Sequence, residues 1–435
     1  MALLHASRRD FLKTGALAGA GYFVAAGLQA KESTSAIQKL NFACVGVGGK
    51  GKSDTEDAAM NGNVIAVCDI DENTLATTSQ AYPSAERFYD YREMFDRLGS
   101  KIDAVTISTP DHTHAAITAM AMRLGKHCFT QKPLTHSLAE ARTLTQLARE
   151  TGVATQMSNQ GTANPGLRKA AAMIRAGALG AVTDIHIWTN RPIWPQGGAR
   201  PSGSLTPKFL HWDQWIGPAT YRRYTEVYHP FSWRGWWDFG TGALGDMVCH
   251  MMNMPFMALD LRNPTTIEAK TSGHNQQSFP SWSVITYKFP KTKDRPEVTL
   301  TWYDGGKRPK RSLLEGEKLG AAGILLIGEK GKLYSPSDYA NNSIFLGGAK
   351  EVPAEFEPAP DGGHFVEFVR AAKGGPPAKA NFADYAGALT ETVLCGNLAV
   401  WKQGKVEWDA ENLRANDAPE LDGIIERPYR PGYTL

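Results

Sequence analysis

The stretch LNFACVGVGGKGKSDTEDAAMNGNVIAVCDID, residues 40–71, decides the fold of this chain. It opens with an apolar run that predicts a buried strand, and the run breaks into Gly46, Gly48 and Gly51 before a short helical segment. In such a layout the first glycine permits a tight turn, the second lets the backbone approach a pyrophosphate, and the third lets the helix pack close to the strand. The stretch therefore predicts a dinucleotide-binding unit.

The residues that follow specify the nucleotide. A second apolar run at 63–68 ends in Asp69, 18 residues beyond Gly51. An acid at this position accepts hydrogen bonds from a ribose diol and repels a 2′-phosphate, so the pattern predicts NAD rather than NADP. Glycines at this spacing also occur in ordinary turns, but the flanking strand, the helix and the acid together favour the binding function.

Composition narrows the class of protein. The 435 residues, 42% hydrophobic and 21% charged, are enough for two packed domains, and no run of about 20 apolar residues predicts a membrane helix. Because 47 Lys and Arg stand against 44 Asp and Glu with no basic run, neither nucleic acid nor a membrane is expected as a partner. The five cysteines form no CxxC pair, which favours buried free thiols over disulfides or a zinc site.

The N-terminus resembles a targeting signal. Residues 7–13, SRRDFLK, match the twin-arginine motif, and a weakly apolar Ala/Gly-rich region at 15–28 leads to a small-residue end near Ala30. The alternative is a basic start followed by an amphipathic helix. We expect residues 1–30 to be a twin-arginine signal peptide and 31–38 a linker. That pathway exports folded proteins, so a periplasmic or otherwise exported protein is expected to acquire its cofactor in the cytoplasm.

Strand and helix patterns alternate from residue 39 to residue 158. Such alternation predicts an α/β Rossmann domain with a parallel sheet, whose ligands bind at the carboxyl ends of the strands. Two strand ends carry polar clusters, at 109–114 and 130–133, and both are expected to face the cofactor. The expected strands are 40–47, 63–68, 103–108, 127–130 and 153–157, and the expected helices include 112–124 and 137–150; the segment 87–95 gives no clear pattern.

Together these motifs resemble the Gfo/Idh/MocA oxidoreductases of sugars and cyclitols. The resemblance rests on the glycine turn, Asp69, a TPxxxH loop at 109–114, GKH at 125–127, Lys132-Pro133, and an Asp-x-x-x-His pattern at 246–250. One departure is Gln131, where the family usually has Glu. The residues that the resemblance assigns to the cofactor are Gly46, Gly48, Gly49, Lys50, Gly51, Asp69, Thr109, Pro110, His114, Gln131 and Lys132.

The resemblance also implies a catalytic group. His250 would accept the hydroxyl proton, Lys132 would bind or polarise the substrate oxygen, and Asp246 would hold another hydroxyl or orient the imidazole. On a helix, the i, i+4 spacing of Asp246 and His250 places both on one face. Considered alone, His250 would be interpreted as a buried core histidine and Lys132 as a surface lysine. Because both occur in matching motifs, a catalytic role is favoured for the two together.

The family fold implies that residues 159–435 form a substrate-binding α+β domain on a large, mostly antiparallel sheet that covers the nicotinamide. The sequence agrees, with a helical pattern at 164–176 and β-forming runs at 182–190, 282–289, 298–303 and 324–327. A helix at 384–401 is expected to pack back across the domain boundary. Family habit also predicts a homo-oligomer, either a dimer or a tetramer.

The polar cluster at 109–114 has a second interpretation. His112, His114 and Asp111 could bind zinc or iron, since imidazole and carboxylate suit both metals. No partner cluster is evident elsewhere, so we expect no metal and place His114 at a helix start near the nicotinamide.

Seven of the 11 tryptophans lie between Trp188 and Trp237, interleaved with Tyr, His and Arg. Aromatic faces suit a pyranose ring, and charged groups can bond its hydroxyls, so this segment is a candidate cleft wall. The simpler alternative is that most of these rings fill the core or an oligomer contact. The candidate substrate residues are Arg191, Trp194, Tyr228, His229, Arg234 and Trp236.

Export and NAD together constrain the function. No nicotinamide pool is evident outside the cytoplasm to reoxidise NADH, so we expect a tightly held NAD that is reduced and reoxidised within one cycle. Relatives use two such schemes: coupled oxidation and reduction of two sugars, and glycoside cleavage through transient oxidation and elimination. Three hypotheses follow: a sugar oxidoreductase, which is favoured, an NAD-dependent glycoside hydrolase or lyase, and a non-catalytic sugar sensor.

Overall fold

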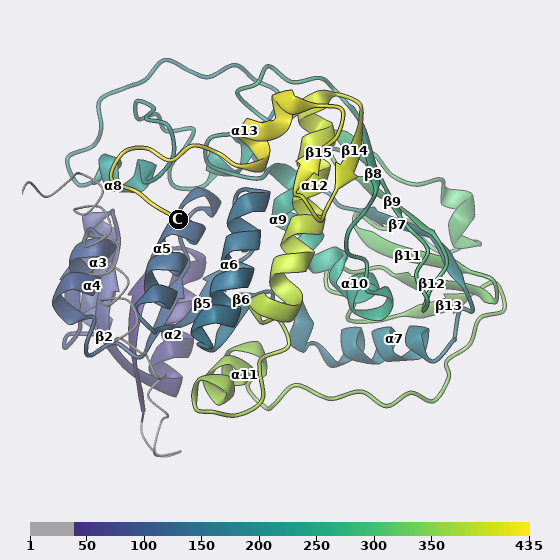
Figure 1. Cartoon of the computed structure of the whole chain (residues 1–435), viewed down its shortest axis with the longest axis horizontal. Coiled ribbons are helices and arrows are strands. Elements are labelled where there is room, and N and C mark those ends of the chain that lie inside the picture. Colours follow the sequence, from purple (N-terminus) through teal and green to yellow (C-terminus); the bar gives the residue numbers. More distant parts are fainter. Residues whose placement is uncertain (1–38) are drawn as a thin grey trace, which may run out of the picture.

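The computed structural model describes residues 39–435, so the predicted signal peptide and linker lie outside the described residues (Figure 1). The first domain is built on a six-stranded sheet, in which every neighbouring pair is parallel and the strand order is β3-β2-β1-β4-β5-β6. This order confirms the predicted Rossmann domain. Its strands are β1 (Leu40–Val45), β2 (Gly62–Cys68), β3 (Glu86–Phe88), β4 (Ala104–Ile107), β5 (His127–Gln131) and β6 (Thr155–Ser158).

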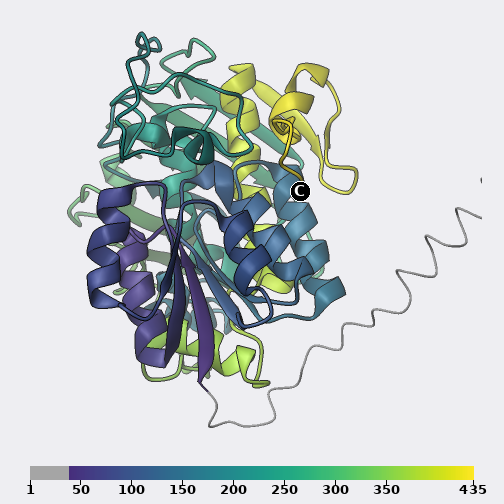
Figure 2. The ribbon, with the colours of Figure 1, turned by 90° about the vertical axis from the view of Figure 1, so that its left-hand side faces the viewer.

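Helices cover both faces of this sheet (Figure 2). Local sequence explains where they begin: Asp71 and Asp90 accept hydrogen bonds from backbone amides at the start of α3 and α4, and Ser137 forms a reciprocal capping box with Glu140 at the start of α6. The short strand β3 and helix α4 occupy the segment that sequence patterns left unassigned. The helices are α2 (Lys50–Asn61), α3 (Glu72–Ala81), α4 (Tyr91–Leu98), α5 (Asp111–Arg123) and α6 (Leu138–Thr151).

The second domain is built on a nine-stranded sheet of order β13-β12-β11-β7-β10-β9-β8-β14-β15. Its paired strands are antiparallel except for β7 and β10, which confirms the predicted mostly antiparallel sheet. Buried and partly exposed residues alternate along β10, so one face packs on the core. The strands are β7 (Val182–Trp188), β8 (Thr266–Thr271), β9 (Ser283–Phe289), β10 (Val298–Tyr303), β11 (Gly323–Gly328), β12 (Gly331–Ser335), β13 (Ile344–Leu346), β14 (Lys405–Asp409) and β15 (Arg414–Ala415).

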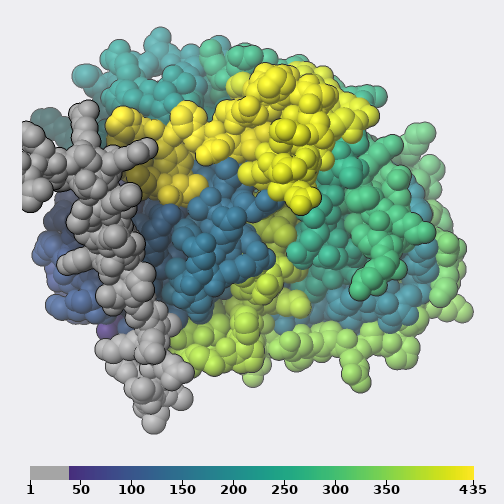
Figure 3. All heavy atoms as spheres, viewed as in Figure 1, coloured from purple at the N-terminus to yellow at the C-terminus, as the bar shows by residue number. Residues whose placement is uncertain are grey.

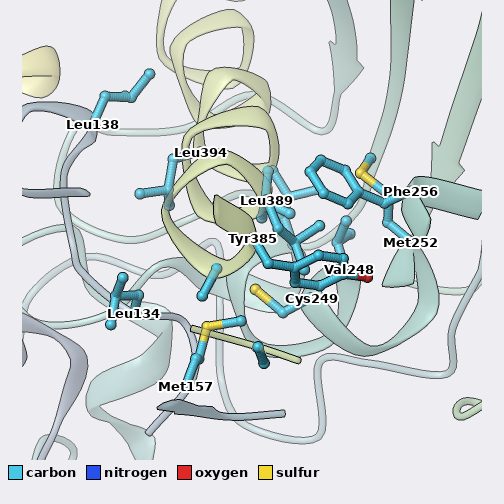
Figure 4. Close-up of a cluster of buried hydrophobic side chains, with 14 of the residues drawn as sticks. Leu134, Leu138, Met157, Val248, Cys249, Met252, Phe256, Tyr385, Leu389 and Leu394 are labelled. Atoms are coloured by element: carbon cyan, nitrogen blue, oxygen red, sulfur yellow. The ribbon is translucent and has the colours of Figure 1, made fainter. Parts of the chain in front are cut away.

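One hydrophobic core joins the two domains. Leu394 of the long helix α12 points toward Leu138 of the first domain, and Leu389 lies on the side of Val248 and Phe256 of the second (Figure 4). This confirms the helix expected to cross the boundary. The remaining helical elements are η1 (Gln160–Ala163), α7 (Pro165–Arg175), α8 (Trp212–Ile216), η2 (Ser232–Gly235), α9 (Gly242–Met251), α10 (Asn253–Leu259), η3 (Arg311–Leu314), α11 (Gly363–Ala372), η4 (Phe382–Ala386), α12 (Gly387–Lys402), η5 (Pro419–Leu421) and α13 (Asp422–Ile425).

Helix α11 departs from a simple division of the chain at residue 158. Although it follows most of the second sheet in sequence, it packs on the first (Figure 2). The ring of Phe365 lies 5.9 Å from that of Phe42 on β1 and 4.7 Å from that of Phe129 on β5. The apolar face of the parallel sheet is therefore closed by a helix from the C-terminal half of the chain.

The last residues lie against both domains on one face of the molecule (Figure 3). Arg427 Nε lies 2.7 Å from Glu140 Oε1 on α6, and Arg430 Nη1 lies 2.5 Å from Asp213 Oδ1 on α8. All five cysteines are buried and unpaired, as predicted. Among residues 39–435, no helix is both long and apolar enough to cross a bilayer.

Candidate active site

The turn between β1 and α2 requires glycine at two positions. A Cβ on Gly51 would lie 1.8 Å from the carbonyl oxygen of Gly46, and a Cβ on Gly46 would lie 2.7 Å from that of Ser108. No side chain caps the N-terminus of α2, and Gly48 and Gly49 line the cleft beside it. The Gly51 and Lys52 amides donate to backbone carbonyl oxygens within the turn, which leaves the Gly49 and Lys50 amides for a pyrophosphate, so the turn fits NAD.

Asp69 occupies the end of β2 at the same cleft. Its Oδ2 accepts a hydrogen bond from the Val47 amide at 2.9 Å, and its Oδ1 accepts one from the Asp71 amide at 3.0 Å. Both bonds fix the carboxyl group beside the glycine turn, where a ribose diol is expected. Burial raises the pKa of Asp69 above its ordinary value. Asp69 therefore lies at the carboxyl end of β2 beside the glycine turn, where the sequence pattern predicted it.

A cleft of about 1010 Å³ lies between the glycine turn and the second domain. Lys132, which directly follows β5, meets Asp246 of α9 in it. Lys132 Nζ lies 2.9 Å from Asp246 Oδ1 and donates to the Asp246 carbonyl oxygen at 2.6 Å, while Arg234 Nε lies 3.5 Å from Oδ1. Burial alone would raise the pKa of Asp246, but the cations of Lys132 and Arg234 hold it below its ordinary value. Asp246 is therefore an ionised group that positions the lysine.

His250 lies one helical turn beyond Asp246 and also lines the cleft. Its Nδ1 is 2.7 Å from Asn159 Oδ1, and the Asn159 amide is fixed because its Nδ2 donates to the Cys249 carbonyl oxygen. Nδ1 therefore carries the proton, which leaves the lone pair on Nε2, an atom with no partner among the described residues. Burial, with Lys132 nearby, holds the pKa of His250 well below its ordinary value, so the ring is neutral and able to accept a proton.

Two neighbours of His250 were not found by sequence reasoning. Asn159 follows β6, so the strand-end rule that singled out the other polar clusters could have identified it. Tyr339 comes from the loop after β12, and its ring lies edge-on to the imidazole with centroids 4.9 Å apart. No local sequence signal marks Tyr339.

Gln131 stands where the family usually has glutamate, and Asp54 supplies a carboxylate next to it. Its Nε2 donates to Asp54 Oδ2 at 2.7 Å and to Ser158 Oγ at 2.8 Å. Asp54 is fully buried on α2, and Lys50 Nζ lies 2.5 Å from its Oδ1. The carboxylate at this strand end is therefore supplied by α2, and Lys132 is held by Asp246 instead.

The two histidines of the 109–114 cluster lie behind the cleft rather than in it. His114 is buried, with Nδ1 2.9 Å from the Pro133 carbonyl oxygen and Nε2 2.7 Å from that of Thr109. His112 bridges the carbonyl oxygens of Phe239 and Trp215 in the same manner. His114 thus joins the two polar loops instead of lining the cofactor site as expected. No group of three or more metal-ligating side chains occurs within residues 39–435.

The structure divides the predicted aromatic wall into two sets. Arg191, His229 and Arg234 line the cleft as expected, whereas Trp194, Tyr228 and Trp236 do not. The last three are buried, with Tyr228 and Trp236 packed edge-on to each other inside a cluster of aromatic rings. Most of these rings therefore form a local core that supports the wall, as the simpler alternative held.

Residues 209–218, here called the strap, cross from the second domain to the first. Leu210 forms an antiparallel bridge with Asp71, and the Glu72 amide donates to the Phe209 carbonyl oxygen at 3.0 Å. The His211 ring stacks on Tyr89 with centroids 4.0 Å apart, and its Nε2 lies 3.0 Å from Glu72 Oε1. The strap lines the end of the cleft that holds Asp69, so it covers the adenosine side. Sequence patterns gave no sign of it.

The fold and the site define an NAD-binding Rossmann protein with a second, sheet-based domain. Residues 40–159 match the model of an oxidoreductase family, NAD-binding Rossmann fold, and residues 193–435 match that family's C-terminal alpha/beta domain. The chain therefore belongs to the Gfo/Idh/MocA oxidoreductase family.

Curated relatives align over part of the chain. It is 34% identical over 109 residues to scyllo-inositol 2-dehydrogenase (NAD(+)) of Bacillus subtilis, covering 25% of this chain and 29% of that relative. It is 27% identical over 161 residues to a glycosyl hydrolase family 109 protein of Solibacter usitatus, covering 33% and 37%. The alignments thus span less than two fifths of either relative.

Solved structures match the whole fold. The WlbA dehydrogenase of Bordetella pertussis, in complex with NADH and UDP-GlcNAcA, has a TM-score of 0.61 at 15% identity, covering 86% of this chain and 99% of that one. The aldose-aldose oxidoreductase of Caulobacter crescentus has a TM-score of 0.58 at 16% identity, covering 85% and 100%. At these identities the likeness shows the fold.

Proposed function

We propose that this protein is an NAD-dependent oxidoreductase that acts on a sugar or sugar derivative. The observation that carries the proposal is the meeting of Lys132, Asp246 and His250, from distant parts of the chain, in the cleft that begins at the glycine turn. Bound NAD would supply the hydride acceptor. The curated relative that is a scyllo-inositol dehydrogenase supports this reaction class.

The residues of the chain would divide the remaining work. His250 Nε2 takes the hydroxyl proton, because Asn159 holds the other ring nitrogen as the donor. Lys132 stabilises the developing charge on the same oxygen, and Asp246 fixes the ammonium in place. Arg191, His229 and Arg234 line the remainder of the cleft and would bind other hydroxyls. The aromatic core behind them keeps this wall rigid.

We further propose that NAD stays bound through many turnovers. The strap supports this, because it bonds to the residues directly after Asp69 and would have to open before the adenosine end could leave. The C-terminal segment reinforces it, since the Arg430 amide donates to the Pro218 carbonyl oxygen at 2.9 Å. The twin-arginine motif at 7–13 supports export to the periplasm, where a retained cofactor would be needed. A homo-oligomer is proposed from family habit alone.

A second candidate is NAD-dependent glycoside cleavage, in which a hydroxyl is oxidised, the aglycone is eliminated, water adds and the ketone is reduced again. The glycosyl hydrolase family 109 relative supports it. A non-catalytic sugar sensor is less consistent with the site, because Lys132 and Asp246 form an ion pair in the cleft that His250 also lines.

A panel of p-nitrophenyl glycosides, together with myo-inositol, tests both candidates without added cofactor. An oxidoreductase changes absorbance at the nicotinamide band on mixing, and a glycosidase releases nitrophenol without net NADH. Turnover that requires stoichiometric added NAD would refute the retained cofactor, and no reaction with any sugar would refute the proposed substrate class.

A further inference from the structure

Asp111 is a second buried carboxyl group of the cleft, and the proposed mechanism gives it no role. It is the first residue of α5, directly after the strand-end loop, and it lines the cleft together with Lys132 and His250. Thr241 Oγ1 donates to its Oδ2 at 2.6 Å. Its Oδ1 has no hydrogen-bond partner among the described residues. This oxygen is also not fully buried among them. One oxygen of Asp111 is therefore free at the cleft.

The two carboxyl groups of this cleft have opposite environments. Asp246 holds Lys132 and Arg234 and stays ionised, whereas no cation among the described residues lies within ion-pair distance of Asp111. Burial raises the pKa of Asp111 to about 7; the Thr241 hydroxyl and the more distant charges of Arg234 and Lys132 oppose this rise without cancelling it. A cleft that separates two carboxyl pKa values in this way assigns them different tasks.

Charged or titratable groups reach Asp111 from each element around it. Arg234 comes from η2, Lys132 from the end of β5, and Asp246 from α9. On its own helix, His112 and His114 bond to backbone carbonyl oxygens on the far side. None of these side chains bonds to Asp111 Oδ1. A substrate bound in the cleft could therefore make contact with this oxygen.

We propose that Asp111 removes a carbon-bound proton of the substrate, next to the carbonyl carbon that sugar oxidation creates. This step rests on the proposed function, because only a carbonyl group makes the neighbouring C–H acidic enough. The C–H bond breaks, its electron pair passes into the enolate of the ketone, and an O–H bond forms at Oδ1. In the reverse step Asp111 returns the proton to carbon. His250 transfers the hydroxyl proton and Asp111 the carbon-bound proton, so each residue transfers one proton.

The position of Asp111 suits it to this task better than an ordinary carboxylate. Burial brings the pKa of Asp111 near the working pH, where a base is effective, and its Oδ1 is free, whereas the Asp246 carboxylate is occupied by Lys132 and Arg234. With the enolate formed, its electron pair can expel a glycosidic oxygen from the next carbon. Asp111 is thus the residue that would allow glycoside cleavage on this scaffold.

Deuterium exchange tests the step directly. The protein is incubated in D2O with the p-nitrophenyl glycosides of the panel, and NMR follows loss of the substrate proton next to the oxidised carbon. We expect exchange by the native protein, with a rate that rises through about pH 7 as Asp111 ionises. Asp111→Asn should slow exchange on the order of 10²-fold or more, while bound NAD is still reduced. Unchanged exchange in Asp111→Asn would overturn the proposal.

A titration that needs no substrate keeps the proposal separate from the proposed function. In protein labelled with ¹³C at aspartate carboxyl carbons, one signal should titrate near neutral pH and vanish in Asp111→Asn. Thr241→Val should move its midpoint upward, because the hydroxyl that stabilises the carboxylate is lost. Asp304→Asn, a buried carboxyl outside the cleft, should remove a different signal. An Asp111 carboxyl that stays ionised between about pH 5 and pH 9 would refute the assignment, even if no sugar reduces NAD.

Discussion

His211→Ala should speed the loss of NAD from the protein. The substitution removes the His211 ring from Tyr89, a stacked pair worth about 0.5–1.5 kcal/mol, and its contact with Glu72, a partly exposed pair worth about 0.2–1 kcal/mol. Together these would favour opening of the strap by roughly 0.7–2.5 kcal/mol. If the strap must open before NAD leaves, the dissociation rate rises roughly 3- to 70-fold.

The rate can be measured by loading the protein with NADH and following its fluorescence after mixing with excess NAD. His186→Ala is a matched control, because His186 also contacts a tyrosine, with Nδ1 3.1 Å from the Tyr303 hydroxyl, but lies on β7 and does not line the cleft. We expect no change in the control. An unchanged rate in His211→Ala, or an equal change in both variants, would show that the strap does not retain the nucleotide.

Substitutions at the catalytic group and at the glycine turn test the site further. Asn159→Leu frees the tautomer of His250 and should lower kcat roughly 10²-fold or more, which steady-state kinetics would measure; an unchanged kcat would reject the role of Asn159. Lys132→Ala and His250→Ala should abolish turnover but keep NAD, so full activity in both would reject their roles. Gly51→Ala should lower the free energy of unfolding by about 1–3 kcal/mol, measured by denaturation, and should abolish NAD binding, measured by nucleotide content. Gly423→Ala is the control, because a Cβ there meets no other atom, and it should leave both quantities unchanged.

The first domain could be predicted because its signals are local. The glycine turn, Asp69 and the polar strand ends each lie within a few residues of the element they mark, and parallel strands bring those ends to one edge. The matching family motifs placed Lys132 and Asp246 in one site, but no rule of spacing across 114 residues predicted that they bond to each other. The substrate domain was likewise predicted in outline, as a mostly antiparallel sheet.

What sequence patterns missed depends on tertiary contacts. The strap bridges Asp71 through backbone hydrogen bonds, which any residue can make and which therefore leave no compositional trace. Helix α11 closes the parallel sheet from the far end of the chain because its Phe365 and Phe368 fit that apolar face. His114, Trp194 and Trp236 do not line the cleft for a related reason: a residue type that suits a ligand also suits a core, and only packing decides between them.

The most direct test of the central claim is mass spectrometry of the nucleotide released by denaturing the purified, extensively dialysed protein. If the cofactor is retained beneath the strap, about one NAD per chain is expected. Little NADP is expected, because the Asp69 carboxylate beside the glycine turn would repel a 2′-phosphate. Protein that arrives free of nucleotide, or that loses it on dialysis and works only when NAD is supplied in proportion to product, would contradict the account.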